Sequence, residues 1–183
     1  MVFRRNLING LTPGYVLGGL TMHNRRIRKT FLIKKQAREE IKELSNYELL
    51  LIGTSLYWAE GTKENRRNIS QRLEFVNSDL KMCQIIIAWL KSCLNVKPEQ
   101  VEYSVYINLN RKGDVDRFLE FWSRGMRVGK KLIKVYYSRS TDNANRHIRK
   151  NYNGQLRIRV LKSTDLNRRV SGLIEGIYEK TKI

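Results

Sequence analysis

The segment Ser45–Lys63 reads Ser-Asn-Tyr-Glu-Leu-Leu-Leu-Ile-Gly-Thr-Ser-Leu-Tyr-Trp-Ala-Glu-Gly-Thr-Lys. Ser45, followed three residues later by Glu48, forms a capping-box pattern and predicts the start of a helix. Between Leu49 and Ala59 no residue is charged. A helix without a polar face must be covered on more than one side. We therefore predict a helix that packs on its own sheet and also on a second partner.

Small residues in this helix indicate what the partner is. Ser55 and Ala59 are four residues apart and share one helix face, and Gly53 removes further bulk. Glu60 follows at the C-terminus, where a carboxylate faces the negative end of the helix dipole, and Gly61 predicts a left-handed cap. A symmetric mate would bring two such carboxylates together beside a cation. The pattern alone leaves open an ordinary buried helix whose Glu60 points into water.

Gly53–Gly61 resembles the LAGLIDADG motif, in which small residues occupy the third and seventh letters and an acid-Gly pair closes the motif. Here those letters are Ser55, Ala59, Glu60 and Gly61. The longer form, Leu56-Tyr57-Trp58-Ala59-Glu60-Gly61-Thr62-Lys63 followed by Phe75-Val76-Asn77-Ser78-Asp79, is similar to a microbial branch of the single-motif LAGLIDADG endonucleases. The resemblance extends over roughly residues 40 to 180.

The resemblance implies an α+β fold of the LAGLIDADG-endonuclease type. In that fold an antiparallel, saddle-shaped sheet carries helices on one face, and the motif helix lies at a two-fold dimer interface. It further implies a homodimer through the Ser45–Glu60 helix, bound to double-stranded DNA at a palindromic or near-palindromic site.

The implied chemistry is phosphodiester hydrolysis with Mg²⁺ or another divalent cation, held by Glu60. Lys162 is the candidate for the basic residue that the family places near the cleaved phosphate, and Lys63 is the alternative. Counting from Leu156, however, strand alternation puts Lys162 on the core side.

The net charge of +19, with a pI near 10.2, favours a polyanionic partner. Nucleic acid is the first candidate and an anionic membrane surface the second. No apolar run reaches the roughly 18–20 residues of a membrane span, and the N-terminal Met-Val-Phe-Arg-Arg-Asn precedes no signal-peptide core. We expect a cytoplasmic protein, or an organellar one if the gene lies in an organelle.

Cysteine and histidine spacings argue against a zinc site or a His-Asn-His nuclease. Cys83 and Cys93 are ten residues apart on one expected helix, so they face different sides and are expected to be reduced core thiols. His23 and His147 have neither a second histidine nor an acid at metal-site spacing.

The N-terminal part is expected to be a basic arm. Residues 1–29 contain Pro13 and several glycines and predict an irregular arm or part of a recognition element, followed by a helix from about Thr30 to Glu43. Arg25, Arg26, Arg28 and Lys29 either lie along a DNA backbone or form a solvated charge run. We therefore divide the chain into this arm and helix, residues 1–44, and a single LAGLIDADG-like domain, residues 45–183.

Hydrophobic periodicity predicts the elements of that domain. Three helices are expected beyond the first: Ser78 or Asp79 to Leu94, Asp114 to Arg124, and Ser163 or Thr164 to Lys180. Four strands are expected: Arg72–Asn77, Val101–Leu109, Leu132–Ser138 and Gln155–Lys162. Ser171–Gly176 resembles a second motif, but its spacing is shorter and only seven residues follow it, so we treat Glu175 as an ordinary helix residue.

Positive charge is concentrated late in the domain. Between Arg124 and Lys162 the only acid is Asp142, against twelve lysines and arginines. Outward-facing residues of the strands would therefore make a basic sheet surface along a DNA groove, although such a face is sometimes only solvated. The candidate DNA-binding residues are Lys63, Arg66, Arg67, Arg72, Tyr106, Asn108, Lys134, Tyr136, Arg139, Arg157 and Arg159.

Three functions follow from these expectations. The first is a site-specific homing-type DNA endonuclease, encoded within an intron. The second is a DNA-binding regulator that keeps the fold without cleavage. The third is a maturase that binds intron RNA. The intact Glu60-Gly61 pair ranks the endonuclease first.

Overall fold

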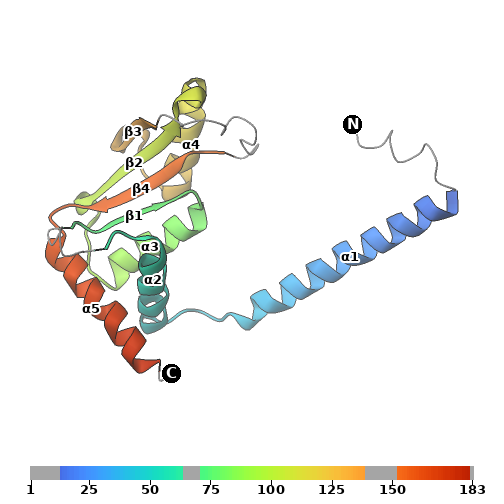
Figure 1. The fold of residues 1–183 in the computed structure, drawn as a ribbon, viewed down its shortest axis with the longest axis horizontal. Coiled ribbons are helices and arrows are strands. Elements are labelled where there is room, and N and C mark those ends of the chain that lie inside the picture. The colour runs from blue at the N-terminus through green and yellow to red at the C-terminus, as the bar shows by residue number, and fades with distance from the viewer. Residues whose placement is uncertain (1–12, 64–70, 139–151, 182–183) are drawn as a thin grey trace. The chain divides into compact units, whose positions relative to one another are not determined.

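The computed structural model describes residues 13–63, 71–138 and 152–181; for residues 13–19 it describes the backbone only. The chain divides into two compact units, Met1–Glu43 and Leu44–Ile183. The elements run from α1 to α5 as labelled in Figure 1. Within the described ranges no helix is both long enough and apolar enough to cross a membrane.

The N-terminal unit contains one long helix, α1 (Pro13–Glu40). The prediction of an irregular arm through residue 29 is therefore wrong from Pro13 onward, while residues 1–12 lie outside the described residues. Pro13 occupies the first helical position, where its missing N–H is not needed. Leu, Arg, Lys and Ala, which are strong helix formers, fill the later turns, so glycines confined to the first turns do not prevent the helix.

The second unit begins with α2 (Asn46–Glu60), and its capping box is formed as predicted. The Glu48 backbone N–H donates to Ser45 Oγ at 3.2 Å, and the Ser45 backbone N–H donates to the Glu48 carboxylate at 2.7 Å. The left-handed cap at Gly61 is wrong, because Gly61 is extended, with φ −82° and ψ 164°. The chain continues directly into an antiparallel bridge with Phe75, and a Cβ at Gly61 would lie 2.4 Å from the Tyr57 ring.

The sheet has four strands in the order β1-β4-β2-β3. The strands are β1 (Glu74–Asn77), β2 (Val101–Asn108), β3 (Ile133–Ser138) and β4 (Gln155–Val160). The structure confirms the α+β class, but the sheet is mixed and not antiparallel throughout, since β3 runs parallel to β2. The physical reason is the connection: α4 (Val115–Met126) crosses between the two strands and returns the chain to the end where β2 began.

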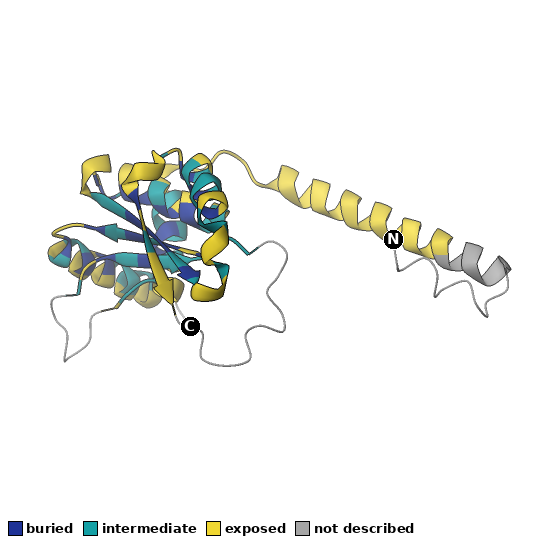
Figure 2. Ribbon diagram, turned by 90° about the horizontal axis from the view of Figure 1, so that it is seen from above, coloured by how far each residue is buried: buried dark blue, intermediate teal, exposed yellow. Residues whose placement is uncertain are grey.

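The core lies between one face of the sheet and the helices of the second unit, including α3 (Leu80–Ser92) and α5 (Thr164–Lys180). Figure 2 shows the buried residues gathered there, in contrast to the exposed α1. The largest fully buried side chains are Trp89, Trp122, Tyr57, Phe75 and Phe118. Gly53 of α2 allows close packing on α3, because a Cβ there would lie 2.1 Å from Trp89.

Candidate nucleic-acid interface

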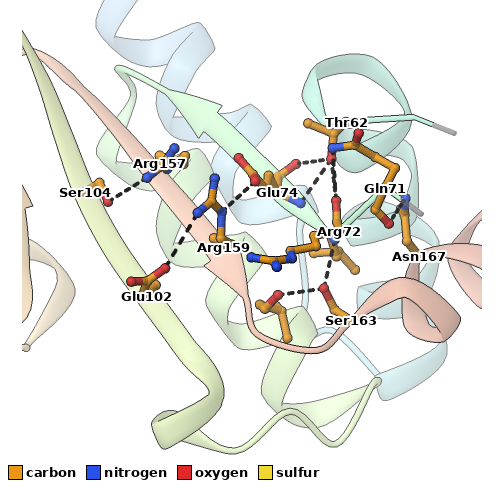
Figure 3. A network of polar contacts seen from close by, with 12 residues as sticks. Thr62, Gln71, Arg72, Glu74, Glu102, Ser104, Arg157, Arg159, Ser163 and Asn167 are labelled. Carbon is orange, nitrogen blue, oxygen red and sulfur yellow. Dashed lines mark hydrogen bonds and ion pairs between the residues drawn. The ribbon is translucent and has the colours of Figure 1, made fainter. Parts of the chain in front are cut away.

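Mostly polar side chains line the sheet face opposite the core, which we call the open face. Strand alternation and register arrange them in rows across neighbouring strands. One row is Glu74, Arg159 and Glu102; the next is Val76, Arg157, Ser104 and Lys134; the third is Gln155, Tyr106 and Tyr136. Figure 3 shows the first row and its link to the end of α2.

Arg159 lies between two carboxylates. Its Nε donates to Glu74 at 2.6 Å, and its guanidinium lies 3.8 Å from Glu102 (Figure 3). Hydrogen bonding to Glu74 is the main reason that the pKa of Arg159 is raised above its ordinary value. Lys134 pairs with Glu102 from the other side, and its hydrogen bond is the main reason that the pKa of Glu102 is lowered. Two of the three open-face cations are thus already paired with carboxylates.

Arg157 makes a different set of contacts. It donates to the hydroxyl of Tyr106 at 2.5 Å and to Ser104 Oγ at 3.1 Å. Its guanidinium lies 5.1 Å from the Tyr106 ring centroid and 5.3 Å from that of Tyr136. The two tyrosine rings stack with centroids 5.5 Å apart. This part of the open face presents aromatic and guanidinium planes and carries no carboxylate among these contacts.

Glu60 is exposed at the last position of α2. Because Gly61 bridges Phe75 of β1, the carboxylate-bearing end of the helix meets the edge strand of the sheet. The face of α2 that leads to Glu60 is open in the described part of the chain: Ser55 and Ala59 are exposed, and Trp58 is 40% exposed. The uncharged strip expected from the sequence is therefore not covered by the described part of its own chain.

A partly buried polar network fixes the chain that follows Glu60. The Tyr57 hydroxyl lies 2.6 Å from the Thr62 carbonyl oxygen and 2.9 Å from Asn167 Oδ1 of α5. Asn167 Nδ2 in turn donates to the Gln71 carbonyl at 3.2 Å, and Thr62 Oγ1 donates to the Arg72 carbonyl at 2.8 Å (Figure 3). Burial is the main reason that the pKa of Tyr57 is raised to about 12, so its hydroxyl stays protonated at neutral pH.

The predicted DNA-binding residues fall into three groups. Tyr106, Asn108, Lys134, Tyr136, Arg157 and Arg159 all belong to the open-face positions of their strands. Lys63 and Arg72 are exposed near the end of α2, and Lys63 lines a pocket with Trp58 and Asn167. Arg66, Arg67 and Arg139 lie outside the described residues.

The prediction that Lys162 ends a strand is wrong. β4 ends at Val160, and Lys162 is exposed in the following turn with a φ of 50°. Strand alternation, which would have placed Lys162 on the core side, does not apply to a residue in a turn.

Sequence reasoning missed the glutamates that neutralise the open face and the Tyr57–Asn167 contact. Alternation did place Glu74 and Glu102 on polar strand faces, but it could not show that β4 lies between β1 and β2. The Tyr57–Asn167 contact joins residues 110 positions apart, and no local pattern marks such a pair.

Metal-binding side chains are sparse in the described part of the chain. No three His, Cys, Asp or Glu side chains of the described residues cluster as a metal site would require. Cys83 is a buried free thiol without a disulfide, and burial is the main reason that its pKa is raised to about 12. At the end of α2, Glu60 offers an exposed carboxylate. One carboxylate is compatible with Mg²⁺, which usually binds one or two carboxylates together with water and substrate phosphate oxygens.

After comparison with known proteins, the resemblance to LAGLIDADG endonucleases is still a prediction that depends on the motif residues alone. No family model, no curated protein and no solved structure matches the chain.

Proposed function

We propose that this chain is a homodimeric, site-specific double-stranded DNA endonuclease of the LAGLIDADG type. The observation that carries the proposal is the uncovered strip on α2. Ser55 and Ala59 are exposed four residues apart, and Glu60 ends the helix beside them. A second copy packed on this strip through a two-fold axis would bring the two Glu60 carboxylates near each other over bound DNA.

The dimer part of the proposal has its own test. Leu51 and Ile52 are only half-buried in the protomer, so a second copy would remove further apolar surface from water. Ala59→Arg would place a charge inside such an interface, and sedimentation velocity should show monomers in place of dimers. Ala88→Arg, at an exposed alanine of α3, is the matched control and should leave dimers intact. Dimers that persist in Ala59→Arg would refute the α2 interface.

Glu60 would hold Mg²⁺ or another divalent cation, which supplies charge stabilisation and water activation at a phosphodiester. The other roles belong to the protein. Lys63 and Lys162, both exposed, are the candidates for contact with the cleaved phosphate. On the open face, Asn108 and Arg157 have the donor groups that read base edges, while Arg159 is occupied by Glu74 and Glu102.

The decisive experiment selects cleaved sites from a randomised duplex library, with Mg²⁺ and with EDTA. We expect double-strand cleavage only with Mg²⁺. Glu60→Gln should reduce cleavage by at least about 10³-fold, since it removes the cation's carboxylate ligand, and should leave duplex binding unchanged. Glu99→Gln, a change at an exposed glutamate away from α2, is the control. Binding of a palindrome without nicking at any metal concentration would instead identify a non-cleaving regulator.

One observation favours a second candidate, an RNA-binding maturase. The stacked Tyr106–Tyr136 pair beneath Arg157 offers the aromatic and guanidinium planes on which proteins stack unpaired bases. Competition between a structured RNA and a duplex DNA of equal length separates the two functions. Preference for the duplex supports the endonuclease, and preference for the RNA supports the maturase.

A further inference from the structure

Every described side chain of α1, from Leu20 to Glu40, is exposed (Figure 2). No acidic residue occurs between Leu20 and Arg38. That interval carries Arg25, Arg26, Arg28, Lys29, Lys34, Lys35 and Arg38. The single ion pair among the described residues of the helix is Lys35–Glu39, at 3.8 Å with both side chains more than half exposed. Such a pair contributes little, so the cations remain available to an outside anion.

The cations of α1 surround the helix instead of sharing one side. Arg25 and Lys29 are four residues apart and share one face. Lys34 lies nine residues after Arg25, and at 3.6 residues per turn this points it to roughly the opposite face, which Arg38 shares. With a rise of 1.5 Å per residue, Arg25 to Arg38 spans about 20 Å of helix.

The apolar residues of α1 argue against a membrane surface as the partner. Leu20, Ile27 and Phe31 share one stripe, but Met22, Leu32 and Ile33 point elsewhere. A helix that lies on a membrane needs its apolar residues gathered on one face and its cations on the other. A helix in the major groove of DNA, by contrast, has phosphate strands on both sides, which suits cations on opposite faces.

We infer that α1 is a second DNA-binding element, which contacts the phosphate backbone of duplex DNA with cations on both of its sides. The contact is electrostatic and independent of sequence, so it adds affinity where the open face adds selectivity. This inference does not depend on cleavage or on Glu60, and it needs only that the chain binds duplex DNA.

The test uses the full chain with Arg25, Lys29, Lys34 and Arg38 changed to Gln, a residue of similar helix propensity. Binding to a fluorescent duplex of random sequence is measured by anisotropy in EDTA over a range of KCl concentrations. If each cation neutralises one phosphate, the slope of log K against log [KCl] should become shallower by about 3–4. Affinity at the lowest salt should fall at least about tenfold.

The matched control changes Lys81, Lys91, Lys97 and Arg127, four exposed cations of the second unit, to Gln. It removes the same charge and should alter the slope by less than about 1. Equal slope changes in both variants, or no change in the α1 variant, would overturn the inference. Stronger α1-dependent binding to phosphatidylserine-rich vesicles than to the duplex would also overturn it. A wild-type chain that cleaves DNA with an unchanged α1-variant slope would leave the proposed function standing and remove this inference alone.

Discussion

The helix α1 and the open face of the sheet carry positive charge in opposite ways. On α1, the cations from Arg25 to Arg38 are exposed and no carboxylate lies among them in the sequence. On the open face, Arg159 lies between Glu74 and Glu102, and Lys134 also pairs with Glu102. The difference teaches that the formal charge of +19 is not equally available to a polyanion. The paired cations of the open face link neighbouring strands, while the exposed cations of α1 can exchange their counterions for DNA phosphates.

The first prediction tests the difference between the two regions through side-chain packing, where we expect the largest change in unfolding free energy. Gly53→Ala places a Cβ 2.1 Å from Trp89 and should destabilise the second unit by about 3 kcal/mol. Leu20→Ala on α1, where the side chain is 56% exposed, should change stability by less than about 0.5 kcal/mol. Urea denaturation followed by tryptophan fluorescence measures both. Similar losses in the two variants would show that α1 packs on a core after all.

The second prediction compares single arginines. Arg159→Gln leaves the partly buried Glu74 without its cation and Glu102 with Lys134 alone, and should cost about 1–3 kcal/mol of unfolding free energy. Arg25→Gln should lie within about 0.5 kcal/mol of the wild type, because nothing in the described residues pairs with it. The same denaturation experiment applies. An Arg159→Gln variant as stable as Arg25→Gln would mean that the open-face pairs contribute no stability.

The third prediction concerns pH and is the smallest. The pKa of Glu102 is lowered from 4.5 in the folded protein, mainly by its hydrogen bond with Lys134. A lowered pKa stabilises the fold above pH 4.5 and loses that contribution as pH falls through the folded value. The stability difference between wild type and Glu102→Gln should therefore shrink from pH 7 to pH 3, and it should stay below about 1 kcal/mol because the Lys134 side chain of the pair is exposed. A difference that grows on acidification would contradict the assigned pairing.

Local signals in the sequence were enough to predict most of the helices and strands. The Ser45–Glu48 capping box set the start of α2, and period-two alternation located β2 and β4 within one or two residues. These signals work because caps and side-chain periodicity depend on neighbours only a few residues away. The same reasoning failed for α1. The prediction gave more weight to the glycines near the helix start than to the helix formers that follow, yet the whole segment is helical.

Sequence by itself determined the uncharged strip of α2, its closing Glu60 and the excess of positive charge. Only the tertiary structure decided which of those charges are paired. Arg159 and Glu74 are 85 residues apart, and they meet because β4 inserts between β1 and β2. The parallel pairing of β3 with β2 was decided in the same way, by the crossover through α4. Strand order is a property of the whole packed core, so no local pattern in the chain encodes it.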